Sequence, residues 1–329
     1  MKKLIISFVL VFVFCFSFIT VSAFDDMPND WSTKALQSAV DNGLLKGSDN
    51  KLYPKNNLTR AEMATILVRA LGAVELGDIS DFTDVQEKDW FYDEMAISYK
   101  MKIFKGDGAG KLTPGTPITR QEAFLVLARA FSLTPVKENG LDVFSDGKDV
   151  SSWAKEGVEA LVTNGYVSGS NGKLNPLSNI TRAEFAQVMF NLIKGYVDSA
   201  QDLAKLDSIE GNVIVRAKDL STLENVTVKG DLIIGDGMSN TLQMENVSAQ
   251  GRVVIRNSGN LKFDGKASEI VITSDSTKLV LSSSSAVKSV TVKSATSSYE
   301  KESATTPSIP VTPPDTPTTP EEDIWTDFH

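Results

Sequence analysis

The sequence predicts a multidomain protein in which an all-α bundle of three helical repeats is followed by an all-β segment resembling a solenoid. A five-residue motif, [LI]-T-R-[AQ]-E, recurs three times at intervals of about sixty residues. The apolar residues after each motif follow the three-and-four spacing of a helix with one buried face. Beyond residue 200, short β-branched runs return after about twenty-one residues, which is typical of a repeating β structure.

The first 23 residues have the features of a signal peptide. Lys2 and Lys3 precede an apolar run, and small residues end the segment before Phe24. An uncleaved anchor helix is the alternative, but the run is slightly short for one. Cys15, the only cysteine, lies in this segment between two bulky phenylalanines, which argues against lipidation. We therefore expect an exported mature chain with no transmembrane segment, disulfide, cysteine-bound zinc or catalytic thiol.

The mature chain is acidic. The full sequence has 33 Lys and Arg against 42 Asp and Glu, and loss of the leader leaves 31 against 42, a net charge of −11. Such a surface argues against nucleic acid or anionic lipid as a bulk electrostatic partner. Any anionic ligand would have to be met by cations placed locally.

Three units, expected at residues 24–78, 79–138 and 139–197, share the same landmarks in one order. Each has Phe-x-Asp, a tryptophan, a glycine with a small or acidic neighbour, Leu-x-Pro and then the motif. The tryptophans are Trp31, Trp90 and Trp153, and the glycine pairs are Gly47 with Ser48, Gly106 with Asp107, and Gly169 with Ser170. This repetition predicts one helical unit built three times.

Each motif predicts the start of a helix. Its threonine stands three residues before its glutamate, which is the spacing of a capping box. These pairs are Thr59 with Glu62, Thr119 with Glu122, and Thr181 with Glu184. Another helix is expected near each tryptophan, ending at Asn-Gly except in the second copy, where Met101 and Lys102 stand instead. One short helix pair cannot bury its apolar stripe, so the three copies should pack around a shared axis.

Capping leaves the arginines of the motif unexplained. Arg60, Arg120 and Arg182 stand in the first helical turn, where the helix dipole disfavours a cation by roughly a few tenths of a kcal/mol. Two roles are open: pairing with a Phe-x-Asp carboxylate of the same or the next repeat, or binding an external acid at the helix N-terminus. The tryptophans are also open to two roles, as core anchors or as groove walls that stack on sugar rings.

The combined pattern resembles the S-layer homology (SLH) domain, and the resemblance covers residues 24 to about 197. Three tandem copies after a signal peptide are that family's usual arrangement. The resemblance implies a pseudo-threefold bundle that binds a secondary cell-wall polysaccharide, commonly one bearing acidic pyruvate ketals, on a Gram-positive-type bacterium. The three motif arginines would then meet the acidic sugar, and the tryptophans and glycine pairs would line the grooves. The second copy departs from the pattern, with Asp107 in place of serine and no Asn-Gly.

Residues 201–297 are expected to form a small parallel β-helix, with a β-sandwich as the alternative. The pattern Glu-Asn-Val, Gly and an apolar triplet occurs from residue 224 and again from residue 245. Parallel β-helices often carry glycan lyases or hydrolases, whose chemistry needs convergent carboxylates. The segment offers acids in no paired pattern, and Asp236 between two glycines fits a corner; the acids are Asp231, Asp236, Glu245 and Asp264.

Residues 298–329 are interpreted as a Thr/Pro-rich linker followed by an acidic tail. The run TTPSIPVTPPDTPTTP is typical of an extended stalk, and EEDIWTDFH is too short to fold. The only histidine is His329. No histidine triad, metal site or cofactor is therefore expected.

The sequence favours a secreted, non-catalytic protein of the cell wall or S-layer, whose three repeats bind an anionic wall polysaccharide and display the β segment. Two alternatives come from other classes of protein. One is a wall-anchored carbohydrate-active enzyme with its site on the β-helix. The other is a subunit of a self-assembling S-layer lattice, for which 329 residues is small. Self-association is left open.

Overall fold

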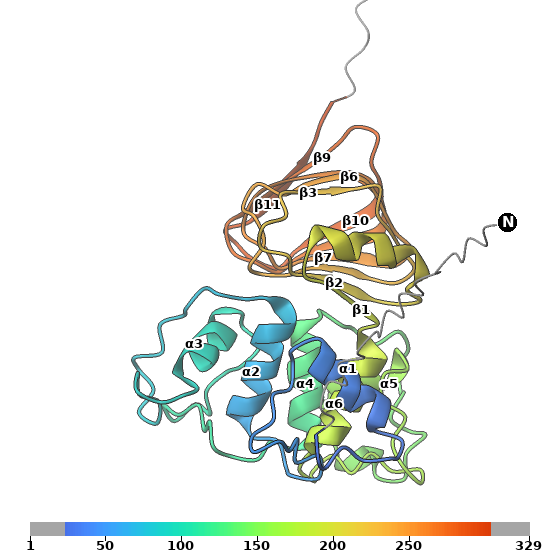
Figure 1. Ribbon diagram of the computed structural model, residues 1–329. Helices are drawn as coiled ribbons and strands as arrows, with labels where there is room; N and C mark the ends of the chain where they lie inside the picture. The colour runs from blue at the N-terminus through green and yellow to red at the C-terminus, as the bar shows by residue number, and fades with distance from the viewer. Residues whose placement is uncertain (1–23, 304–329) are drawn as a thin grey trace, which may run out of the picture.

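The computed structural model describes residues 24–303, in which a helical part lies beneath a β part (Figure 1). The expected signal peptide with Cys15, and the stalk and tail from residue 304 to His329, lie outside the described residues. Within the described range, the helical part has six α-helices and one short 3-10 helix. They are α1 (Thr33–Asp41), α2 (Arg60–Leu71), α3 (Tyr92–Lys100), α4 (Arg120–Ala130), η1 (Gly147–Asp149), α5 (Lys155–Thr163) and α6 (Arg182–Leu192).

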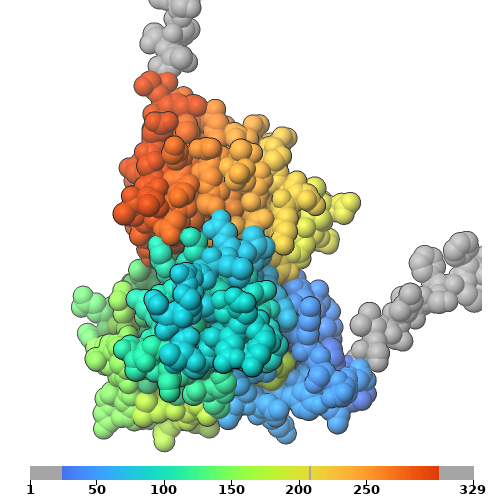
Figure 2. Space-filling view, turned by 90° about the vertical axis from the view of Figure 1, so that its left-hand side faces the viewer, coloured from blue at the N-terminus to red at the C-terminus, as the bar shows by residue number. Residues whose placement is uncertain are grey.

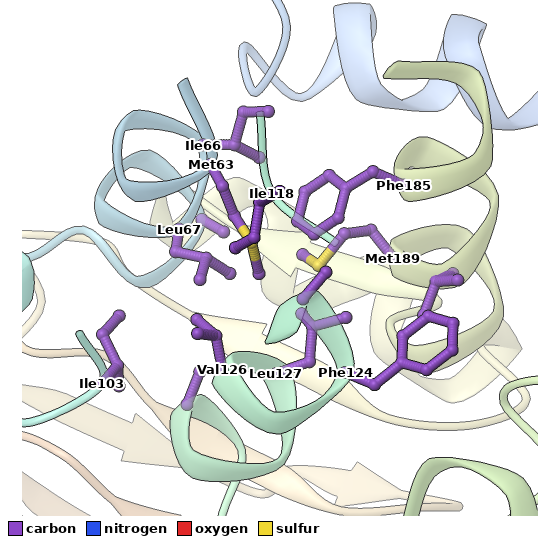
Figure 3. Close-up of a cluster of buried hydrophobic side chains, with 14 of the residues drawn as sticks. Met63, Ile66, Leu67, Ile103, Ile118, Phe124, Val126, Leu127, Phe185 and Met189 are labelled. Carbon is purple, nitrogen blue, oxygen red and sulfur yellow. The ribbon is translucent and has the colours of Figure 1, made fainter. Parts of the chain in front are cut away.

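Neighbouring repeats pack by pairing helices across their boundaries. The first helix of one repeat lies against the second helix of the repeat before it, so α3 packs on α2, α5 on α4, and α1 on α6. The second helices α2, α4 and α6 send apolar side chains toward one another into a shared core (Figure 3). The buried residues on these faces include Met63, Leu67, Phe124, Leu127, Phe185 and Met189. The expected packing around a common axis is therefore the way each amphipathic helix buries its stripe.

The second repeat ends its first helix differently from the others. In the first and third repeats, Gly43 and Gly165 follow the helix with positive φ values of 67° and 80°. Lys102 takes this left-handed conformation in the second repeat, with φ of 61°, at a cost of roughly 1–2 kcal/mol for a residue with a Cβ. Its ammonium forms an ion pair with Asp275 of the β part at 2.7 Å. The departure seen in the sequence thus places a cation between the two domains.

The β part is a stack of strands in which every pairing within the described residues is parallel, so the β-helix prediction is confirmed and the β-sandwich is excluded. The solenoid has a three-sided outline in Figure 1. The strands are β1 (Gly195–Val197), β2 (Val213–Val215), β3 (Thr222–Glu224), β4 (Thr227–Val228), β5 (Leu232–Ile234), β6 (Gln243–Ala249), β7 (Arg252–Ile255), β8 (Gly259–Ile272), β9 (Thr277–Leu281), β10 (Ala286–Val292) and β11 (Ser298–Lys301). The sheet thus runs from 195 to 301, beyond both expected limits.

One face of the solenoid is buried against the helices (Figures 1 and 2). This face stacks β1, β2, β5 and β7 in register, and its apolar triplets are buried throughout. The outer residues of each triplet point into the solenoid, whereas the middle residues Ile214, Ile233 and Val254 belong to the helical core. A parallel strand covered on both sides needs a continuous apolar run, which explains the triplets.

Arginines from the solenoid cap the C-terminal ends of the helices. Arg216 donates to the carbonyls of Arg69 in α2 and Asn42 after α1, at 2.6 and 2.8 Å. Arg256 donates to the carbonyls of Ala130, the last residue of α4, and Met101, which follows α3, at 3.0 and 3.3 Å. The last carbonyls of a helix lack partners within it and carry partial negative charge, so guanidinium groups stabilise them.

Asp236 lies where the solenoid approaches α2 most closely. Its backbone N–H donates to the Leu71 carbonyl, and its carboxylate pairs with Arg256 at 3.1 Å. A Cβ on Gly237 would lie 2.1 Å from the Gly72 carbonyl oxygen, so only glycine allows this approach. Burial raises the pKa of Asp236, and the pairing with Arg256 opposes that shift. The corner expected here is thus also a contact between the two domains.

The solenoid therefore holds the C-terminal ends of the bundle helices, and the motif residues lie at the opposite ends of α2, α4 and α6. Each motif is at the N-terminus of one of these helices, and the C-terminus of the same helix meets the solenoid. No helix within residues 24–303 is long and apolar enough to cross a membrane.

Candidate functional site: three clefts at the repeat boundaries

The three motifs meet in a closed ring of backbone hydrogen bonds. Leu58 donates to Ile180, Ile180 to Ile118, and Ile118 to Leu58, each N–H reaching its carbonyl at 2.9–3.0 Å. The first free N–H groups of each helix are also used, because the N–H groups of Arg60 and Ala61 donate to the carbonyls of Thr116 and Pro114. The other two helices make equivalent bonds. The Leu-x-Pro landmark thus supplies acceptors for the helix of the preceding repeat, and those helical N–H groups are not available to a ligand.

All three motif helices begin with a complete capping box. Each threonine hydroxyl accepts from the backbone N–H of its glutamate, and each glutamate accepts from the backbone N–H of its threonine; the pairs are Thr59 with Glu62, Thr119 with Glu122, and Thr181 with Glu184. The glutamate uses only Oε2 for capping. Its Oε1 remains for a second partner.

That second partner is the arginine of the preceding repeat. Arg182 reaches Glu62 at 2.8 Å, Arg120 reaches Glu184 at 2.9 Å, and Arg60 lies 3.8 Å from Glu122. The Nε of each arginine also donates to the leucine carbonyl of Leu-x-Pro, in Leu52, Leu174 and Leu112. Only 11–13% of each arginine side chain is exposed. The motif therefore links each repeat to the next around the ring.

This arrangement corrects the internal pairing that the sequence suggested. The Phe-x-Asp carboxylates do not contact the arginines. Asp26 instead accepts from the backbone N–H groups of Leu52 and Tyr53 in its own repeat, at 2.7 and 2.8 Å. Asp84 and Asp146 do the same in the other repeats. The arginines nevertheless line open clefts, so their bonds to glutamate and leucine do not remove them from the surface that a ligand can reach.

Three clefts lie where three repeats meet, and each brings together one arginine, one glycine pair and one tryptophan. We name them by the repeat that supplies the glycine pair. Their shared members are Arg182, Gly47, Ser48, Glu62 and Trp90 in cleft 1; Arg60, Gly106, Asp107, Glu122 and Trp153 in cleft 2; and Arg120, Gly169, Ser170, Glu184 and Trp31 in cleft 3. Their volumes are about 470, 510 and 380 Å³. Each cleft therefore depends on all three repeats.

The tryptophans form walls of these clefts and are not core anchors. Trp31, Trp90 and Trp153 are 62, 65 and 54% exposed, which rules out the core role considered from sequence. The glycines have a packing role as well. A Cβ on Gly47 or Gly106 would lie 2.4 Å from the ring of Phe24 or Phe82, so the Phe-x-Asp landmark packs directly against the glycine.

The clefts differ in residues that sequence reasoning did not single out. Lys46 and Lys105 line clefts 1 and 2 directly before the glycine, where cleft 3 has Ser168. Arg129 lines cleft 2, whereas Asn191 stands at the equivalent helix position in cleft 3. The lysines next to the glycines were visible in the sequence, but Arg129 could be placed in a cleft only with the fold known.

Three of the four solenoid acids noted in the sequence, Asp231, Asp236 and Asp264, have partners within the protein. Asp231 pairs with Arg252 at 2.6 Å, and Arg252 also donates to the Ser132 carbonyl after α4. Asp264 accepts from Ser284 on the solenoid surface. Among the residues from 24 to 303, no group of three or more His, Cys, Asp or Glu side chains is arranged to hold a metal ion.

Comparisons with known proteins match the repeats to one family. The S-layer homology domain profile matches residues 23–64, 81–124 and 143–186. The Surface-layer 125 kDa protein of Lysinibacillus sphaericus is 34% identical over 228 residues, which are 68% of this chain and 19% of that protein. An Amylopullulanase of Thermoanaerobacterium thermosulfurigenes is 31% identical over 176 residues (52% and 9%), and a Cellulosome-anchoring protein of Acetivibrio thermocellus is 36% identical over 147 residues (43% and 33%).

The chain spans a third or less of the length of each of these relatives. What is shared is therefore a module found in surface-layer proteins, in an anchoring protein and in enzymes. S-layer homology domains anchor proteins to the cell wall and bind its polysaccharide. The chain is an S-layer homology domain protein, with three tandem copies of the domain followed by a parallel β-solenoid.

Proposed function

We propose that this protein is exported and held on the bacterial cell surface by binding an anionic secondary cell-wall polysaccharide in its three clefts. Pyruvate ketals are the acidic groups that the family resemblance favours. In this proposal the helical part is the wall anchor, and the solenoid is a non-catalytic unit displayed from it.

The carrying observation is the composition of the clefts. Each combines an exposed tryptophan, which can stack on the apolar face of a sugar ring, with a guanidinium group that can bind an acidic substituent. Three equivalent clefts on one rigid bundle also suit a repeating polymer, because linked sites gain affinity when they can be occupied together.

The solenoid is supported in a display role by its placement. It covers the C-terminal ends of α2, α4 and α6, and none of its described residues lines a cleft, so polysaccharide can occupy the clefts without contacting it. Two of its acids, Asp231 and Asp236, are committed to ion pairs at the domain interface. Catalytic carboxylates would have to be free to act on a substrate, so these ion pairs favour a structural role for the two acids.

Replacing Trp31, Trp90 and Trp153 together with alanine tests the proposal. We expect the triple variant to lose wall binding by at least tenfold in cosedimentation with purified walls, because a total loss of about 1.4 kcal/mol over the three clefts already lowers affinity tenfold. Folding should be nearly unaffected, since these side chains are more than half exposed.

The exposed residues Val136, Val143 and Leu177 offer a control, because they lie outside the lining of all three clefts. Their triple alanine variant should bind walls like the wild type. Equal binding by the wild type and a folded tryptophan variant would refute cleft binding.

A further inference from the structure

Cleft 2 contains the guanidinium group of Arg129, which has no bonding partner among the described residues. Arg129 stands ten residues after Thr119 on α4, and Arg69 holds the equivalent position on α2. Arg69 donates to the Leu44 carbonyl at 3.2 Å, but the guanidinium group of Arg129 makes no hydrogen bond or ion pair with any described residue. Arg129 lines cleft 2, whereas Arg69 lines none of the three clefts.

Partial burial makes this arrangement costly without a ligand. Arg129 is partly buried, and no carboxylate among the described residues forms an ion pair with it. Burial lowers the pKa of Arg129 from the ordinary value. A cation withdrawn from water loses hydration, and only a nearby anion or acceptor offsets the loss. In an acidic chain of this kind, a half-buried arginine that avoids the available carboxylates is suited to an external anion.

The motif arginine of cleft 2 is also the least engaged of the three. Arg60 lies 3.8 Å from Glu122, compared with 2.9 and 2.8 Å for the corresponding pairs in clefts 3 and 1. Its Nε and Nη2 donate to the carbonyls of Leu112 and Lys105, so Nη1 is left without a hydrogen bond among the described residues. Nη1 of Arg60 therefore faces Glu122 only at the longer distance of 3.8 Å, beyond hydrogen-bond range.

The acid that distinguishes cleft 2 is already occupied. Oδ1 of Asp107 accepts from the backbone N–H groups of Ala109 and Lys111, at 2.7 and 3.1 Å, and these bonds lower the pKa of Asp107. The carboxylate thus shapes its own loop and stays ionised. Arg129 and Lys105 more than balance its charge, so cleft 2 keeps a net positive lining despite the loss of serine at this position.

We propose that cleft 2 is an acid-selective site, in which the carboxylate of an acidic sugar lies between Arg60 and Arg129 while Trp153 packs on the sugar ring. This inference rests on the proposed function and adds Arg129 as a specificity-determining residue outside the repeated motif. It assigns the second repeat a binding role of its own. Asn191 at the same position of cleft 3 cannot supply this charge.

The test compares the full-length variants Arg129→Gln and Arg69→Gln, which remove the same group from equivalent helix positions. The probe is wall polysaccharide in two forms, native and with its carboxyl groups reduced to alcohols. We expect Arg129→Gln to bind the native polymer about tenfold more weakly than wild type in calorimetric titration, as loss of a charge-assisted bond implies. Arg69→Gln should bind within twofold of wild type.

Binding to the reduced polymer separates charge recognition from folding. Wild type and Arg129→Gln should bind it equally, and Arg129→Lys should fall between wild type and Arg129→Gln on the native polymer. Equal native binding by wild type and Arg129→Gln would overturn this inference and leave the anchor function standing. An equal loss on both polymers would also overturn it, because the effect would not depend on the acid. Failure of wild type itself to bind would refute the proposed function.

Discussion

Replacing Arg182 with alanine is expected to lower the free energy of unfolding by about 3–5 kcal/mol. The Arg182 side chain is 11% exposed and joins the third repeat to the first through Glu62 and the Leu52 carbonyl, each at 2.8 Å. The variant would leave a carboxylate and a carbonyl without their partner at the closing contact of the ring. Urea denaturation followed by circular dichroism measures the loss.

A double-mutant cycle with Glu62→Ala shows whether the pair itself is responsible. Glu62 also caps Thr59, so its own replacement costs about 1 kcal/mol more than the ion pair. We expect the double variant to lose less than the sum of the single losses, by about 1–3 kcal/mol. Additive losses, or a loss below about 1 kcal/mol for Arg182→Ala, would mean that the contact behaves as an ordinary surface pair.

Replacing Arg256 with alanine should destabilise the protein by a similar amount, about 3–5 kcal/mol, through the contact between domains. Arg256 is 3% exposed and bonds to Asp236 and to the carbonyls of Ala130 and Met101. Without it, a largely buried carboxylate and the carbonyls at two helix ends lose the guanidinium group that they share. Thermal and urea unfolding of the full chain measure the effect.

Lys262 provides the control for this change. It also belongs to an ion pair of the solenoid, with Glu302 at 2.9 Å, but its side chain is 46% exposed. Lys262→Ala should change stability by no more than about 0.5 kcal/mol. If Arg256→Ala is as mild as Lys262→Ala, the solenoid is not held to the bundle by the contacts described.

The sequence predicts the regular elements well because their signals are local. The apolar residues from Met63 to Leu71 follow the helical period, and Thr59 with Glu62 marks the start of that helix. Residues 253–255 sit in a β-branched run of the length expected for a short buried strand. Capping and periodicity act within a few residues of chain, so neither requires knowledge of the fold.

The partners of the arginines could not be predicted in the same way. Arg182 meets a glutamate 120 residues earlier, and the capping role of that glutamate gave no sign of a second bond. The exposure of the tryptophans was equally hidden, because an aromatic residue beside a helix is more often part of a core. Closure of the ring decides both, and closure is a property of the three repeats together.

The sequence indicates the interface between bundle and solenoid only indirectly, through the apolar triplets of the solenoid strands. In a solenoid with one wet face, the middle residue of each triplet would be polar, yet Ile214, Ile233 and Val254 are apolar. These three residues join the core of the helical part. An uninterrupted apolar triplet in successive coils therefore indicates a covered face, although it does not say what covers it.

A crystal structure of the full chain bound to fragments of wall polysaccharide tests the central claim most directly. The account predicts sugar rings against Trp31, Trp90 or Trp153, with acidic groups beside the neighbouring arginines and the solenoid left unoccupied. Saccharide bound to the solenoid, with all three clefts empty at saturating ligand, would contradict it.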